Sequence, residues 1–340
     1  MSSDYIQDVK WLLKDGQNLI IKSEEDELGF GFLPWERPPE LYIRYGAVNL
    51  DKPPGPTSHQ VAAWVKRILG VSKTGHGGTL DPMVTGVLPI GLEKATLVMR
   101  YIVGSSKEYV GIIHLHSDVD EEDLKRVFGL FKGRIYQKPP QRSSLRRRLR
   151  TRAIYSLEIL EKEGRDILFH INCESGFYVR KLAHDIGLIL GCGAHLAELR
   201  RVRAGPFHEK DHLATLYDLV GAKYLWDEED DFSLMRKVVV PMEYVFKDFP
   251  KIIVKDTAVA SIVYGAQLKI PGIMAFTDDV EKDKRVILIT RKGEAIAVAI
   301  SKYTAEELRA LDKGVATLTE RVVMEKGIYP PMWKRSSEST

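Results

Sequence analysis

One carboxylate stands between a glycine-rich turn and an apolar run, in the stretch GHGGTLDPMVTGVLPIG (residues 75–91). An ionised Asp81 at such a position can act as a nucleophile or as a general base. An aspartate just before a proline is also well suited to capping a turn or a helix. The residues around Asp81 are compatible with both interpretations.

A cation with an unusual position lies in ESGFYVRKLAHDIG (residues 174–187). Its apolar residues recur at helical spacing, and Ser175 is a candidate cap, so Arg180 is expected near the start of a helix. A cation there opposes the helix dipole, at a cost of up to about 1 kcal/mol when exposed. Arg180 therefore either faces water or holds a buried carboxylate.

Six arginines occur in the short segment QRSSLRRRLRTR (residues 141–152), which contains no acid. They are Arg142, Arg146, Arg147, Arg148, Arg150 and Arg152. Such a run is either a solvated face or a loop that contacts phosphates. We favour the phosphate-contacting loop, because guanidinium groups this close together repel one another unless they are solvated, screened or neutralised by a polyanion.

Several familiar chemistries lack their motifs. The chain has no G-x-x-x-x-G-K-[ST] or G-x-G-x-x-G loop and no serine nucleophile elbow. The two cysteines, Cys173 and Cys192, are too few and too far apart for a zinc cluster or a disulfide scaffold. Four histidines lack the spacing of H-E-x-x-H, namely His76, His114, His116 and His184. We expect neither a metal nor a cofactor.

Composition indicates an intracellular globular protein of two domains. Of 340 residues, 44% are hydrophobic and 29% are charged. We find no transmembrane segment and no secretory signal, and we expect a cytoplasmic protein without a membrane partner. The formal net charge is only +3. Total charge therefore does not identify an anionic partner.

The elements that must hold these residues indicate a mixed α+β fold. Helical spacing after Thr57 and Ser58 predicts a helix that Gly70 closes. Residues 154–163 and 166–174 look like paired strands around a tight turn, and WDEEDD (residues 226–231) looks like an exposed loop. Hairpins among the strands argue against a purely parallel, doubly wound sheet.

From about Phe249 the pattern changes to a small β-rich domain. Short strands are expected at residues 251–256, 285–290 and 294–302, with a boundary near Pro250. We predict four parts, which are an N-terminal extension (1–40), a first domain (41–248), a β-rich domain (249–333) and a flexible tail (334–340).

Five ordered segments together resemble the TruB-type pseudouridine synthases, and most closely the dyskerin subgroup of archaeal type. They are VNLDKPPGPTSHQV, GHGGTLDPMVTGVLPIGLEKAT, KEYV, GFYVRKLAHDIG and HLAELRRVRAGPF. The resemblance spans nearly the whole chain, and the C-terminal part resembles a PUA domain. It implies a catalytic domain with a largely antiparallel sheet flanked by helices, and a PUA-type pseudobarrel against which the extension packs.

The resemblance also implies site residues. Asp81 corresponds to the essential aspartate, Arg180 to its arginine partner in a dry pocket, and Tyr109 to the tyrosine that stacks on the base and helps to remove the C5 proton. The implied substrate-binding residues are His76, Leu199 and Lys52, and the implied RNA-binding residues are Arg146, Arg147, Arg148 and Arg150. Whether Asp81 attacks C1′ or removes a proton from C2′ stays open.

The implied function is conversion of uridine to pseudouridine in rRNA, and in tRNA as a further substrate, without a cofactor. The subgroup works in H/ACA ribonucleoproteins, which implies a guide RNA, a substrate RNA and three protein partners. These are a small Nop-family protein, a glycine-arginine-domain protein and a kink-turn-binding ribosomal-type protein. Alternatives are guide-free modification of the tRNA T-loop and an RNA-binding scaffold. A glycosidase is less favoured, because it usually needs two carboxylates.

Overall fold

The structure, a computed structural model, describes residues 4–23, 28–138 and 148–332. The chain divides into two compact units. One is continuous, Gly46–Val240, and the other combines Met1–Tyr45 with Pro241–Thr340. We call the first the central unit and the second the terminal unit.

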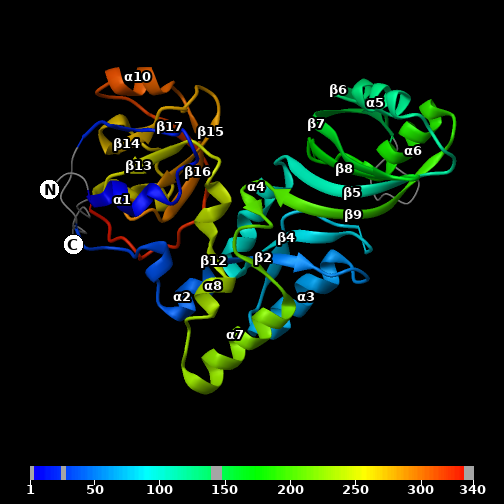
Figure 1. The fold of residues 1–340 in the computed structure, drawn as a ribbon. Coiled ribbons are helices and arrows are strands. Elements are labelled where there is room, and N and C mark those ends of the chain that lie inside the picture. The colour runs from blue at the N-terminus through cyan, green and yellow to red at the C-terminus, as the bar shows by residue number, and fades with distance from the viewer. Residues whose placement is uncertain (1–3, 24–27, 139–147, 333–340) are drawn as a thin grey trace, which may run out of the picture. The chain divides into compact units, whose positions relative to one another are not determined.

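The central unit is built on a large mixed sheet (Figure 1). Its strand order is β11-β2-β4-β9-β5-β8-β7-β6, with β3 added beside β4 and β10 beside β9. The strands are β2 (Gly46–Lys52), β3 (Thr74–His76), β4 (Thr85–Leu92), β5 (Lys107–Leu115), β6 (Gly133–Gln137), β7 (Arg150–Glu163), β8 (Asp166–Cys173), β9 (Ala194–Ala204), β10 (Phe207–His208) and β11 (Leu213–Ala214).

Most neighbouring strands of this sheet are antiparallel, while β4 pairs with β9 and β11 pairs with β2 in parallel. The predicted α+β class is confirmed, and so is the β7–β8 hairpin, which turns at Gly164 with φ of 56°. The contact between β4 and β9 requires a glycine. A Cβ on Gly86 (φ 94°) would lie 2.2 Å from the Arg201 carbonyl oxygen.

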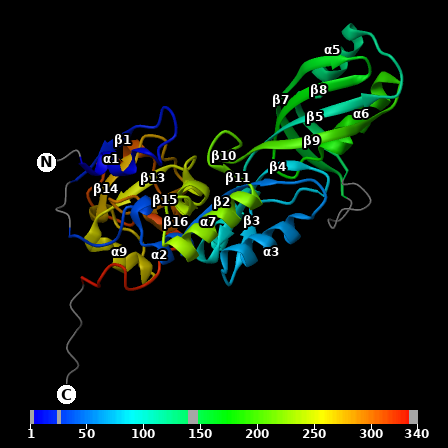
Figure 2. The same cartoon turned by 60° about the horizontal axis from the view of Figure 1, so that its bottom comes forward.

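Helices cover parts of the sheet. They are α3 (Ser58–Leu69), η2 (Glu93–Leu97), α4 (Met99–Val103), α5 (Glu121–Leu130), α6 (Val179–Leu190), α7 (Leu216–Glu229) and α8 (Met235–Val238). Apolar residues of α5 and α6, among them Val127 and Leu182, share one buried core with Ile113 of β5 and Phe169 of β8 (Figure 2). This core fixes where α6, and with it Arg180, lies on the sheet.

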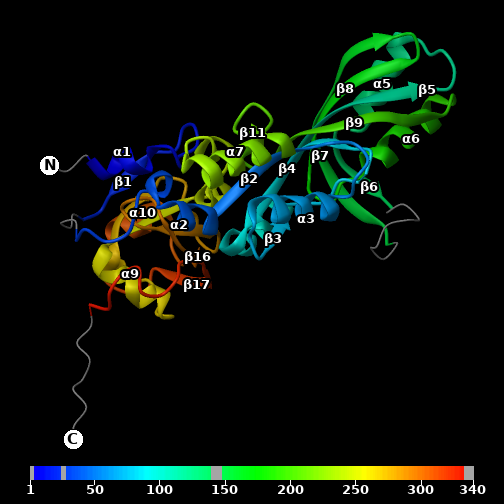
Figure 3. The same cartoon turned by 90° about the horizontal axis from the view of Figure 1, so that it is seen from below.

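Helix α3 begins and ends as predicted, and it lies beside β3 (Figure 3). Thr57 and Gln60 form a capping box, and Gly70 ends the helix with φ of 66°. Two local predictions were wrong. Ser175 does not cap α6, since Tyr178 is the residue at the N-cap. The acidic run is no loop, because its first four residues continue α7 up to Glu229.

The terminal unit holds a six-stranded sheet of order β1-β14-β13-β15-β16-β17. Its strands are β1 (Leu19–Ile21), β13 (Lys251–Val254), β14 (Ile273–Thr277), β15 (Arg285–Ile289), β16 (Ala295–Ser301) and β17 (Thr317–Val322). Its helices are α1 (Asp4–Lys10), η1 (Pro34–Glu36), α2 (Pro39–Arg44), η3 (Met242–Phe246), α9 (Asp256–Val263), η4 (Ile270–Gly272) and α10 (Ala305–Ala310). Strand β12 (Val240–Pro241) spans the boundary between the units.

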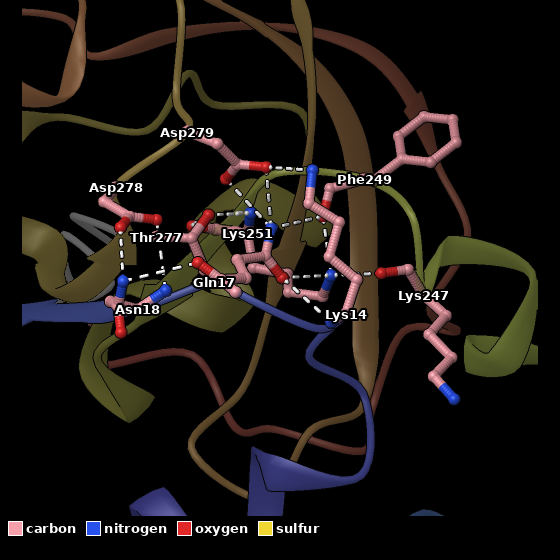
Figure 4. Close-up of polar contacts among 10 residues, drawn as sticks. Lys14, Gln17, Asn18, Lys247, Phe249, Lys251, Thr277, Asp278 and Asp279 are labelled. Carbon is pink, nitrogen blue, oxygen red and sulfur yellow. Dashed lines mark hydrogen bonds and ion pairs between the residues drawn. The ribbon is translucent and has the colours of Figure 1, made fainter.

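Polar contacts fix the N-terminal arm, residues 4–23, to this sheet (Figure 4). Gln17 donates to both carboxylate oxygens of Asp279 at 2.9 Å, and its own oxygen accepts from the buried Lys251 ammonium at 2.9 Å. Lys251 also donates to the carbonyls of Lys247 and Phe249. Burial lowers the pKa of Lys251 to about 7. The arm is therefore held by buried hydrogen bonds as well as by the β1–β14 pairing.

Candidate active site

The structure brings Asp81 and Arg180 together. Asp81 lies in the segment between β3 and β4, and Arg180 is the second residue of α6. Nη2 of Arg180 donates to Oδ2 of Asp81 at 2.7 Å. The carboxylate therefore supplies the negative charge that the arginine needs at a helix N-terminus. The pairing joins residues that are 99 positions apart in the chain.

The pair is open to solvent, which corrects the expectation of a buried carboxylate in a dry pocket. Both side chains are 61% exposed, and a single hydrogen bond joins them. An exposed ion pair contributes only about 0–1 kcal/mol to stability. The pair is therefore held in place by the backbone on either side and leaves one carboxylate oxygen, Oδ1, available to a ligand.

Lys52 fixes the segment that follows Asp81. Its buried ammonium donates to the carbonyls of Pro53 (2.8 Å), Pro82 (2.8 Å) and Val84 (3.0 Å). Burial lowers its pKa. An ammonium has three N–H donors, so all of them are used within the protein. This corrects the expectation that Lys52 contacts the substrate, since it positions the Asp81 segment instead.

Tyr109 lies on β5 directly opposite Arg201 of β9. Tyr109 is half-buried, and Arg201 is only 1% exposed. Burial raises the pKa of the Tyr109 hydroxyl, while the neighbouring Arg201 guanidinium opposes that rise and Asp81 adds to it. Tyr109, Asp81 and Arg201 therefore form one electrostatic group.

Arg201 was not among the predicted site residues. The pair of adjacent arginines in HLAELRRVRAGPF offered a signal, because successive residues of a strand face opposite sides of a sheet. Arg200 is half-buried and holds Asp51 and Glu209 by hydrogen bonds of 2.8–3.1 Å. Because the two arginines face opposite sides of the sheet, one of them can be buried while the other is more exposed.

Leu199 and Tyr109 are both partly buried and pack against the same core cluster. Leu199 lies opposite Gly111 of β5. A Cβ on Gly111 would lie 2.9 Å from a Leu199 methyl and 2.7 Å from the Glu198 carbonyl oxygen. Gly111, also absent from the predicted site residues, therefore makes room for Leu199.

His76 ends β3, five residues before Asp81. Its Nδ1 accepts from the Gly78 N–H at 3.4 Å, and its ring meets that of His59 edge-on with centroids 4.8 Å apart. Burial lowers the pKa of His76, and His59 and Arg201 lower it further. A hollow of about 480 Å³ runs beside both histidines and is lined by Lys66 and Lys73.

The arginine run is described only in part, since Arg142, Arg146 and Arg147 lie outside the described residues. Arg148 is exposed, and Arg150 is the first residue of β7. Arg152 pairs with Glu174 at 3.5 Å. Of the described members, Arg148 and Arg150 are therefore the two with no intramolecular ion pair.

Within the described residues, no group of three or more His, Cys, Asp or Glu side chains is arranged to hold a metal ion. Nor is any helix there long and apolar enough to cross a membrane. The chemistry on offer at the site is an exposed carboxylate beside a guanidinium, with a tyrosine hydroxyl close by.

Four family domains match along the chain. Residues 66–179 match the N-terminal domain of TruB family pseudouridylate synthases, and residues 180–247 match the C-terminal domain of tRNA pseudouridylate synthase B. Residues 250–323 match a PUA domain, and residues 7–62 match a DKCLD (NUC011) domain.

Full-length relatives agree with these matches. A probable tRNA pseudouridine synthase B of Pyrococcus horikoshii is 48% identical over 319 residues, which cover 93% of this chain and 96% of the relative. A chain in the crystal structure of a Cbf5–Nop10–Gar1 complex is 47% identical with a TM-score of 0.87, over 93% of this chain and 97% of that one. A chain in the structure of an H/ACA RNP bound to a substrate RNA containing 2′-deoxyuridine is 45% identical with a TM-score of 0.87, over 93% and 98%.

The site around Asp81 thus lies within the segments that match the synthase domains, and the chain belongs to the TruB family of pseudouridine synthases, with DKCLD and PUA domains added.

Proposed function

We propose that this pseudouridine synthase is the catalytic subunit of a guide-RNA-directed H/ACA ribonucleoprotein, with Asp81 as its acting carboxylate. One observation carries the assignment of the site, namely the 2.7 Å contact between Asp81 and Arg180. The assembly rests on two similar chains, one in a Cbf5–Nop10–Gar1 complex and one in an H/ACA RNP bound to substrate RNA.

The reaction breaks the bond between N1 of uracil and C1′ of the ribose, turns the base, and joins C5 to C1′. An ionised Asp81 either attacks C1′ or removes a proton from C2′. Arg180 sets the direction of the carboxylate through its hydrogen bond to Oδ2. Both side chains are 61% exposed in the protein alone. The everted nucleotide therefore has to supply the cover that excludes water, at an unstacking cost of a few kcal/mol.

The neighbouring residues take distinct roles. Tyr109 stacks on the base and accepts the C5 proton, and Leu199 supports the floor beneath the ring. His76 contacts the flipped nucleotide. Its lowered pKa favours the neutral ring near pH 7, and we assign His76 a contact with the nucleotide rather than a proton transfer.

RNA affinity comes from surfaces outside the site. The exposed Arg148 and its neighbour Arg150 contact backbone phosphates, as do Arg146 and Arg147. The PUA domain binds a distant RNA end. Base pairing between guide and substrate selects the uridine, while the protein reads RNA shape and backbone.

Three proteins complete the particle, which are Nop10-like, Gar1-like and kink-turn-binding partners. The first two follow from the complex that contains a similar chain. We also propose the four-part organisation of the chain, with boundaries after residues 40, 248 and 333.

A second candidate is guide-free modification of the tRNA T-loop. It is favoured by the name of the Pyrococcus relative, a probable tRNA pseudouridine synthase B. An RNA-binding scaffold with a dispensable site is less favoured, because Asp81 contacts Arg180 and also forms one electrostatic group with Tyr109 and Arg201.

Release of tritium from C5 of labelled uridine in RNA tests these functions. The protein alone and the complex with guide RNA and partner proteins are each given an rRNA fragment and a tRNA T-stem-loop. We expect turnover of the rRNA fragment only with the matching guide. Guide-independent release from the T-stem-loop alone would establish the second candidate, and the absence of release from both RNAs would leave the scaffold.

A further inference from the structure

The buried Arg201 side chain lies opposite Tyr109 and holds the chain near Asp81. It is 1% exposed. Its Nε donates to the Val87 carbonyl at 2.7 Å, and its Nη2 donates to the Gly78 carbonyl at 3.1 Å. Gly78 precedes Asp81 by three residues, and Val87 lies on β4 beyond it. Arg201 thus joins the two sides of the segment that carries the acting carboxylate.

Within the part of the chain that the structure describes, no carboxylate compensates this buried charge. Among the ion pairs of the described residues, Arg200 holds Asp51 and Glu209, whereas Arg201 has no acidic partner. Removing a guanidinium from water without an opposite charge is costly, typically by several kcal/mol. Two carbonyl contacts can be made by a neutral donor as well. The retained charge therefore requires a further reason.

Tyr109 is the side chain that this charge faces across the sheet. Tyr109 and Arg201 are direct cross-strand partners on β5 and β9, which lie side by side (Figure 1). Partners in an antiparallel pair have Cβ atoms about 4.5–5.5 Å apart on one face. The guanidinium favours the ionised phenol and so opposes the effect of burial on the pKa of Tyr109.

The other charged and titratable groups near this pair do not replace Arg201. Asp81, from the β3–β4 segment, disfavours the phenolate. Cys173 of β8 stays neutral, since burial raises its pKa to about 12. Burial lowers the pKa of Lys107 to about 7, and its ammonium donates to the carbonyls of Ile102 and Ser105. His76 is neutral near pH 7.

We infer that Arg201 is a positioning residue that acts through Tyr109: its guanidinium stabilises the phenolate that takes the C5 proton, and its bonds to the Gly78 and Val87 carbonyls hold the Asp81 segment. The inference rests on the proposed function, because it concerns the last step of that reaction. Neither role requires Arg201 to touch the RNA.

Atoms and electrons balance in this step. Once C5 is joined to C1′, the Tyr109 phenolate oxygen takes the proton from C5. The C–H electron pair forms the C5–C6 double bond, and the pair of the former C6–N1 double bond moves to N1. N1 takes a proton from water, and the Tyr109 phenol returns its proton to the hydroxide so formed. The net change is an isomerisation.

The test uses single-turnover rates of the complete complex with guide RNA, measured from pH 6 to pH 9 on substrates with protium or deuterium at C5. Arg201→Gln removes the charge. A positive charge within a few ångströms typically lowers such a pKa by about 1–3 units. We therefore expect about 10- to 1,000-fold slower turnover at each pH in this range, and a larger isotope effect than in the wild type.

Three further variants separate the phenolate role from loop support. Arg201→Lys keeps a charge and should show a smaller loss of rate. Arg200→Gln, the neighbouring control, should keep the isotope effect. In a Tyr109→Phe background, Arg201→Gln should lower the rate by a smaller factor than it does alone, because the part of its effect that depends on the phenolate is already lost.

Thermal unfolding of each variant shows that it is folded. The inference is overturned if Arg201→Gln slows turnover while leaving the isotope effect unchanged, or if its full loss multiplies with that of Tyr109→Phe. A wild-type complex that forms no pseudouridine with any guide would instead overturn the proposed function, and the inference with it. If the wild-type complex forms pseudouridine and Arg201→Gln keeps the wild-type isotope effect, the inference alone is overturned.

Discussion

The two compact units use charge in opposite ways. In the central unit the Asp81–Arg180 pair has one hydrogen bond, and both side chains are 61% exposed. In the terminal unit Arg37 makes two hydrogen bonds to Glu243, at 2.7 and 3.0 Å, with side chains that are 5% and 0% exposed. The first pair can be reached by a ligand, and the second cannot.

The difference distinguishes an ion pair that is available for the reaction from one that stabilises the fold. An exposed pair adds about 0–1 kcal/mol, so its position depends on the backbone that Lys52 and Arg201 hold. Breaking a buried pair costs about 3–5 kcal/mol, because one charge is left without a partner. Loss of a charge should therefore reduce activity at the exposed Asp81–Arg180 pair and stability at the buried Arg37–Glu243 pair.

The largest expected effect follows Asp81→Asn. The amide keeps the size of the side chain but can neither attack C1′ nor take a proton, so turnover should fall by at least about 100- to 10,000-fold. The free energy of unfolding should change by less than about 1 kcal/mol. Tritium release and urea unfolding measure the two quantities. Persistent turnover, or a large loss of stability, would contradict the assignment of this exposed pair to the reaction.

The converse change is Arg37→Met. It leaves Glu243 and its neighbour Glu294 buried without the guanidinium, so the free energy of unfolding should fall by about 3–5 kcal/mol. The rate per folded molecule should stay at the wild-type value. Arg44→Met is the matched control, because the Arg44–Glu325 pair is 49% and 26% exposed and should contribute at most about 1 kcal/mol. Equal losses for both variants would contradict the distinction.

The buried Glu294 carboxyl also predicts that the free energy of unfolding depends on pH. Burial raises the pKa of Glu294 from 4.5 to about 7. Below pH 4.5 the carboxyl is protonated in the folded and the unfolded chain, and its contribution to stability is fully present. As pH rises toward 7 the unfolded chain loses this proton first, so stability falls, by an amount on the order of 3 kcal/mol.

Urea unfolding between pH 4.5 and 7.5 measures this slope. Glu294→Gln should remove it, since the amide does not titrate. Glu306→Gln, at an exposed position on α10, should behave as the wild type does. A slope that survives in Glu294→Gln would assign the effect to another group.

The smallest effect is expected on the surface of the central unit. The double change Arg148→Glu and Arg150→Glu should weaken RNA binding and lower the slope of log affinity against log salt by about 0.7–0.9 for each phosphate that the protein no longer binds. Arg126→Glu, on the exposed side of α5, should leave the slope unchanged. Binding measured at several salt concentrations decides the point, and an unchanged slope in the double variant would make this arginine run a solvated face.

Local patterns were sufficient for most of the secondary structure. The cap at Thr57, the turn at Gly164 and the β-rich region after Phe249 were predicted correctly, because each depends on residues close together in the chain. The acidic run is helical up to Glu229 although its charge is typical of an exposed loop, because glutamate is a good helix former.

The amino-acid sequence by itself determined the family, the mixed α+β class and the candidates Asp81, Arg180 and Tyr109, because these depend on ordered motifs and local periodicity. Only the tertiary structure decided which polar groups are buried. It placed Asp81 and Arg180 in solvent, and it turned Lys52 and Arg201 inward to hold the backbone around them. Burial depends on strand register and on contacts between distant segments, and the free energy of a charge depends on that burial more than on its neighbours in the chain.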